Sequence, residues 1–142
     1  MHNDTATIVG NPDFITGGYA YFTVSNDKGT HFTFRVTKRK GEDSSPYFVS
    51  VLKGPDNTRN YKYMGLYRRQ NNVLEIRGKS TFKSADVEPR TFQWALHVIA
   101  GQVQLKEGYR IQHAGKCCVC ARMLTTPDSI ARGIGPTCAS KP

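Results

Sequence analysis

All four cysteines of the chain lie in one C-terminal stretch, between Cys117 and Cys138. Cys117 and Cys120 form a C-x2-C pair, which places two sulfurs on one tight turn at the separation that a tetrahedral metal needs. Cys138 follows after a 17-residue loop and supplies a third thiolate. Closely spaced cysteines in a reducing compartment more often bind metal than form disulfides. The spacing therefore predicts a structural Zn²⁺ site near the end of the chain.

A structural zinc site needs a fourth ligand. His113 precedes Cys117 by four residues, close enough for its imidazole to complete a Cys3His tetrahedron. Cys118 competes for this position, but a residue next to a ligand usually points away from the metal. We therefore predict that the metal ligands are His113, Cys117, Cys120 and Cys138. Cys118, water or a partner chain are the alternatives for the fourth position.

The same stretch resembles a known sequence pattern. Cys117 to Leu124 and Pro127 to Ala139 are similar to C-x-x-C-G-R-x-L and P-x-S-I-x-x-G-I-G-P-x-C-A. This pattern marks an uncharacterised family of small domains from bacteria and their phages, which are expected to bind zinc. Ala121 departs from it, since the family usually has Gly there. The resemblance implies a metal site and a bacterial or phage origin, and it brings no activity.

The residues before this stretch must fold into the body that carries it. Five segments alternate or are rich in aromatic and β-branched residues, as strands are, and a sixth candidate covers residues 5–10. Asn26 to Gly29 tolerate positive φ and predict a hairpin between the first two segments. The five segments are Tyr19–Ser25, His31–Thr37, Tyr47–Leu52, Tyr61–Tyr67 and Val73–Arg77.

A helix is expected after these strands. Pro89 suits a first helical turn, and Phe92, Leu96 and Ile99 have helical spacing. The predicted fold is α+β: an antiparallel, curved sheet with one packed helix and a small zinc-bound C-terminal unit. Residues 1–104 would form the β-rich body, with its helix at about 89–100, and residues 105–142 the zinc-binding unit. Tyr109 to Gln112 fit either a short strand or an extended linker.

Composition limits the possible functions. The chain has 142 residues and a formal net charge of +9. No apolar run approaches the roughly 20 residues of a membrane-spanning helix, and the first residues lack a signal-peptide pattern. We expect a soluble, cytoplasmic protein, and the resemblance above implies that it belongs to a bacterial cell or is encoded by a phage. The positive charge is concentrated between Lys28 and Lys83, with 13 basic and 4 acidic residues.

Basic and aromatic residues alternate within this region. Such a sheet surface could hold single-stranded nucleic acid by stacking and by phosphate contacts, so that binding would weaken with salt. Tyr47 and Tyr67 belong to the same run of tyrosines, which could instead be packing residues. The residues predicted to bind a partner are Lys38, Arg39, Lys40, Lys53, Arg59, Tyr61, Lys62, Tyr63, Arg68 and Arg69.

Catalysis is not indicated. Three thiolates with a fourth protein ligand make a closed zinc site, and neither His97 nor His113 starts the H-x-E pattern of zinc deaminases. We expect a non-enzymatic zinc protein that binds nucleic acid, single-stranded in preference. The alternative is a phage host-takeover or anti-defence inhibitor, of the anti-CRISPR type for example, that binds an acidic host protein through the same charges.

Overall fold

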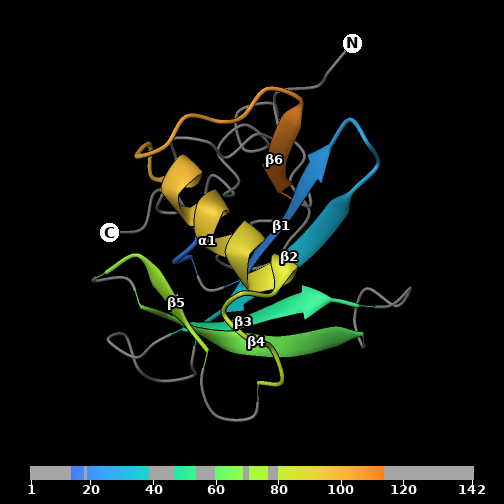
Figure 1. Ribbon diagram of the computed structural model, residues 1–142. Helices are drawn as coiled ribbons and strands as arrows, with labels where there is room; N and C mark the ends of the chain where they lie inside the picture. Colours follow the sequence, from blue (N-terminus) through green and yellow to red (C-terminus); the bar gives the residue numbers. More distant parts are fainter. Residues whose placement is uncertain are drawn as a thin grey trace.

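In the part of the chain that the structure describes, six antiparallel strands form one curved sheet, and one helix lies against a face of it (Figure 1). The computed structural model describes residues 14–17, 19–38, 47–53, 60–68, 71–76 and 80–113. The sheet order is β5-β4-β3-β2-β1-β6. This confirms the predicted α+β class with a curved antiparallel sheet. The elements are β1 (Tyr19–Asn26), β2 (His31–Thr37), β3 (Tyr47–Leu52), β4 (Tyr61–Arg68), β5 (Val73–Glu75), α1 (Val87–Ile99) and β6 (Tyr109–His113).

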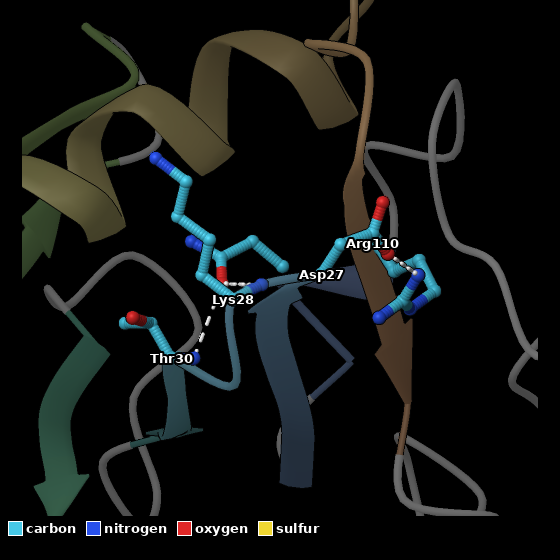
Figure 2. A network of polar contacts seen from close by, with 5 residues as sticks. Asp27, Lys28, Thr30 and Arg110 are labelled. Atoms are coloured by element: carbon cyan, nitrogen blue, oxygen red, sulfur yellow. Dashed lines mark hydrogen bonds and ion pairs between the residues drawn. The ribbon is translucent and has the colours of Figure 1, made fainter.

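The β1–β2 hairpin forms where the alternation predicted it. Phe22 on β1 faces Phe34 on β2, and neither is exposed to solvent. The turn is closed by the side chain of Asn26, whose Oδ1 accepts hydrogen bonds from the backbone N–H groups of Lys28 (3.0 Å) and Thr30 (3.1 Å) (Figure 2). Gly29 has φ +86°. That conformation favours glycine, so the turn chemistry and the strand pairing agree.

Strand β6 returns from the helix to the sheet beside β1. Ile111 pairs with Val24, and His113 pairs with Phe22. The hairpin turn is also tied to the start of β6: Asp27 accepts an ion-paired hydrogen bond of 2.8 Å from Arg110 (Figure 2), and its N–H donates to the Gly108 carbonyl at 3.1 Å. The segment that fitted a strand or a linker is therefore a strand. Sequence analysis assigned these residues to the C-terminal unit, residues 105–142. In the structure they form the strand that extends the sheet beside β1.

The core lies between α1 and the sheet. Phe92 on α1 has no exposed surface, and its ring centroid lies 5.2 Å from that of Phe34 and 5.9 Å from that of Phe22. Burying a side chain of this size contributes about 2–3 kcal/mol. Gly101, with φ +80°, follows the end of the helix. In the part of the chain that the structure describes, no helix is long and apolar enough to cross a membrane.

A β-bulge interrupts the pairing of β3 with β4. Val49 pairs with Gly65 and Ser50 pairs with Tyr63, so Met64 is an extra residue on β4, and it is fully buried. An added residue reverses which face the following side chains point to. Tyr61 and Tyr63 precede the bulge, whereas Tyr67 follows it and is only 5% exposed.

At Gly65, strand β4 approaches the backbone of β5 closely. A Cβ atom at this position would overlap the backbone carbonyl oxygen of Glu75 on β5. We expect Gly65→Ala to lower the free energy of unfolding by about 2–3 kcal/mol in urea denaturation, because the backbone of β5 must move. Gly29→Ala is the control: its Cβ meets nothing within 4 Å, and its positive φ should cost only about 1 kcal/mol. Equal losses in the two variants would contradict the close approach.

Candidate functional site

The alternation of side chains gives the sheet two chemically different faces. The face toward α1 carries Phe22, Phe34 and Val49, none of which is exposed. The next cross-strand row points the other way: Tyr21 pairs with Arg35, Arg35 with Ser50, and Ser50 with Tyr63. Successive residues of a strand point to opposite sides, so this row lies on the face away from the helix.

Aromatic rings and one arginine share this face. We call Tyr21, Arg35, Phe48, Tyr61 and Tyr63 the aromatic outer face. Tyr21 and Tyr61 come from β1 and β4, with two strands between them, yet their ring centroids are 6.0 Å apart. Phe48 and Tyr63 are neighbours at 6.4 Å, and Phe48 is 40% exposed. All five side chains are at least partly open to solvent.

Arg35 lies between Tyr21 and Ser50 in the cross-strand row of the aromatic outer face. Its guanidinium carbon is 4.5 Å from the centre of the Tyr61 ring, a cation–π distance, and Nη2 donates a long hydrogen bond of 3.5 Å to Ser50 Oγ. Nε is buried and has no hydrogen-bond partner, and Arg35 makes no ion pair with any residue that the structure describes. A cation that stacks on a ring and has no carboxylate partner among the described residues is suited to an anionic ligand.

The Tyr61 phenol keeps its proton in this setting. Burial raises the pKa of Tyr61 above its ordinary value, and the neighbouring Tyr21 phenol raises it further, while Arg35 opposes both. Tyr61 is therefore a neutral ring with an O–H donor at neutral pH. The positive charge of Arg35 is therefore not cancelled by a Tyr61 phenolate.

The structure divides the predicted partner-binding residues between the two sides of the sheet. Tyr61 and Tyr63 lie on the aromatic outer face, but Lys62 between them pairs with the buried Val51 and extends toward the ring of Phe82, 5.5 Å away. Arg68 lies toward the end of β4 and forms a 2.6 Å ion pair with Glu75. Lys38 follows β2 and is exposed. Arg39, Lys40, Arg59 and Arg69 lie outside the described residues.

Lys53 is bound to the helix. Its Nζ donates to Glu88 Oε2 at 2.6 Å, in the first turn of α1. The Glu88 side chain is only 11% exposed, against 45% for Lys53. Burial alone would raise the pKa of Glu88, but the hydrogen bond from Lys53 and the Glu88 backbone hydrogen bond hold that pKa below its ordinary value of 4.5. Lys53 thus stabilises the contact between the helix and β3 instead of offering a free charge.

The structure removes two tyrosines from the candidate binding surface and adds three residues to it. Tyr47 and Tyr67 pack in the core, with their ring centroids 6.2 Å apart. Tyr21, Arg35 and Phe48 were not among the residues predicted to bind a partner, although all three lie on predicted strands. Their positions alternate with Phe22, Phe34 and Val49, so the period-two pattern could have found them. The missing information was which strands become neighbours.

His113, the predicted fourth zinc ligand, ends β6. Its ring is 6% exposed and lies 6.0 Å from the ring of Phe14, inclined by 30°. Cys117, Cys118, Cys120 and Cys138 lie outside the described residues. Among residues 14–113, as far as the structure describes them, no three His, Cys, Asp or Glu side chains gather as metal ligands would. The zinc site therefore stays a prediction.

Comparison with known proteins gives one partial match. A family of unknown function, DUF6011, matches residues 111–142. The match begins in β6 and spans His113 and all four cysteines. The resemblance of the C-terminal segment to an uncharacterised family is thereby confirmed, and less than a quarter of the chain is covered. No curated protein and no solved structure matches the chain.

The lowered pKa of Glu88 predicts an acid-sensitive contact. A carboxyl whose pKa is lower in the folded state adds stability above its unfolded-state value, and this stability is lost as the pH falls through the folded-state value. We expect Glu88→Gln to lower the free energy of unfolding by about 0.5–1 kcal/mol at pH 7, because the exposure of Lys53 screens the pair. The difference should shrink below pH 4.5. Denaturation of the exposed control Glu107→Gln should match the unmodified protein, and a pH-independent loss in Glu88→Gln would contradict the ion-pair explanation.

Proposed function

We propose that this protein binds single-stranded nucleic acid through the aromatic outer face, without catalysing a reaction. The observation that carries the proposal is the Arg35 guanidinium stacked 4.5 Å from the Tyr61 ring, with no carboxylate partner among the described residues. Aromatic rings and Arg planes on an open sheet are the groups on which unpaired bases stack. The solvent-accessible Phe48 and Tyr63 extend this surface across β3 and β4.

The distribution of charge favours stacking as the main source of affinity on this face. Lys53 and Arg68, two of the predicted binding cations, are already paired with Glu88 and Glu75. A cation with a carboxylate partner releases few counterions when a phosphate approaches. Among the described residues, Arg35 is therefore the cation on this face best suited to meet a phosphate, and the rings would supply contacts that do not depend on salt.

The C-terminal segment adds a structural zinc site to the proposal. His113 ends a strand that is hydrogen-bonded into the sheet, which would give the metal-bound unit a fixed point of attachment. Three thiolates and one imidazole form a closed donor set of the kind that holds structural zinc. Such a site binds metal as the segment folds, since a segment of this size has too little core to fold alone.

An inhibitor of a host or defence protein is the second candidate. Phe48 is 40% exposed, and apolar anchors of this kind also bind protein partners. An acidic partner would satisfy Arg35 as a phosphate would. The bacterial or phage origin and the cytoplasmic location proposed for the chain fit both candidates, so the test must separate nucleic acid from protein.

Fluorescence anisotropy with labelled single-stranded and duplex DNA and RNA tests the nucleic-acid proposal. Single strands should bind more tightly than duplexes. Phe48→Ala and Tyr63→Ala should each raise the dissociation constant by about fivefold or more, since stacking of one base is worth about 1–3 kcal/mol. Their salt dependence should remain that of the unmodified protein, whereas Arg35→Gln should reduce the slope of log K against log salt by about 0.7.

Val103→Ala is the matched control for Phe48→Ala. Val103 is 42% exposed, close to the 40% of Phe48, and lies between α1 and β6. Its loss should leave nucleic-acid binding unchanged. If no oligonucleotide binds at low salt, the nucleic-acid proposal is wrong. Capture of a host protein that depends on Phe48 would then support the inhibitor.

Metal analysis tests the zinc site. Purified protein should contain one equivalent of zinc, and Cys138→Ser should lose it and destabilise the C-terminal segment, because a three-coordinate remnant binds weakly. His113→Ala should also weaken binding. Tight zinc in His113→Ala would point to Cys118 or an outside group as the fourth ligand. A full zinc equivalent in Cys138→Ser would show that the ligand set is wrong.

A further inference from the structure

A second concentration of rings and cations lies along α1, away from the aromatic outer face. It is a cleft of about 340 Å³, lined by Val87, Arg90, Thr91, Trp94, Lys106 and Tyr109. Ligand pockets range from about 300 to 1,000 Å³, so this volume suits a ligand of small size. Arg90 and Trp94 also line an adjoining cleft of about 300 Å³. The two residues are one helical turn apart and form a ridge between the clefts.

The walls of the larger cleft are aromatic. The rings of Trp94 and Tyr109 have centroids 5.4 Å apart and planes inclined by 66°. They come from α1 and β6, and both are partly open to solvent. Two rings set at such an angle form a corner, in which a flat ligand ring can stack on one wall and meet the edge of the other.

Two cationic side chains line the same cleft as these rings. Arg90 and Lys106 are exposed, and the Lys106 ammonium lies 5.6 Å from the centre of the Tyr109 ring. No Asp or Glu is among the described residues that line either cleft. Arg90 has a planar guanidinium that can bind a phosphate through two hydrogen bonds, and Lys106 supplies a second positive charge. The Thr91 hydroxyl is a further polar group in the lining.

We propose that this cleft binds one nucleotide, a flat base stacked in the corner of Trp94 and Tyr109 with its phosphate between Arg90 and Lys106. The two cations match the charge of a phosphate monoester, and the rings match a planar heterocycle. The volume limits the occupant to a single nucleotide. Its source is a free mononucleotide or the phosphorylated end of a strand. The proposal goes beyond the function proposed above and does not depend on it.

Trp94 reports directly on this cleft because it is the one tryptophan in the chain. Full-length protein is titrated with adenosine monophosphate, adenosine and inorganic phosphate while its tryptophan emission is recorded. The monophosphate should change the emission saturably, with a dissociation constant of about 0.1 mM. Adenosine should bind at least about tenfold more weakly than the monophosphate. Inorganic phosphate, measured by competition with the monophosphate, should also bind at least about tenfold more weakly, since each of the two makes only half of the contacts.

Charge variants make the assignment specific. Arg90→Ala and Lys106→Ala should each weaken binding of adenosine monophosphate by about tenfold, since both residues are exposed and their loss spares the fold. Lys28→Ala removes an exposed charge in the hairpin turn and should not change binding. Tyr63→Ala, on the other side of the sheet, should also leave the titration unchanged. Oligonucleotides with and without a 5′-phosphate show whether a strand end can replace the free nucleotide.

Two results would overturn the proposal. One is the absence of a saturable emission change up to about 5 mM adenosine monophosphate, a concentration at which even a millimolar site would be mostly filled. The other is a titration that is the same in Arg90→Ala, Lys106→Ala and the unmodified protein. Loss of oligonucleotide binding in Tyr63→Ala with an intact Trp94 titration would show that the two surfaces act independently.

Discussion

Phe92 packs against Phe22 and Phe34, and this contact determines what the rest of the sheet can do. It buries one face of β1 and β2 under α1. Once one face is buried, a one-residue slip would expose the whole apolar set, so the register of the strands is fixed. The residues between these positions then have to point outward. The aromatic outer face is thus a consequence of core packing, and Arg35 is brought beside Tyr61 by the same constraint.

The elements of this fold could be predicted because their signals are local. Alternation in Tyr19–Ser25 and in His31–Thr37, with Asn26 and Gly29 between them, defines a hairpin within a few residues. The helix from Val87 to Ile99 follows from the spacing of Phe92 and Leu96. The packing of the described helix on one face of the sheet follows from the apolar side of this amphipathic segment.

The candidate binding face could be predicted only in part, because it depends on contacts between distant segments. Tyr61 was found from composition, but its partners Tyr21 and Arg35 come from strands that lie beside β4 only after the sheet has formed. The buried Met64 bulge had no sequence signal, and it turns Tyr67 into the core while Tyr63 stays outside. A count of charges also cannot predict ion pairs such as that of Lys53 with Glu88, because the two residues are 35 positions apart in the chain.

Strand β6 connects the α1 cleft with the C-terminal segment. Tyr109 at its start lines the α1 cleft, and His113 at its end leads into the segment that matches DUF6011. In the described part of the chain β6 is an edge strand, held by its pairing with β1 and by the ion pair of Arg110 with Asp27. Because Asp27 is 70% exposed, that pair adds little stability. A metal that binds His113 would therefore stabilise β6 from its far end and, through the same strand, hold Tyr109 against Trp94.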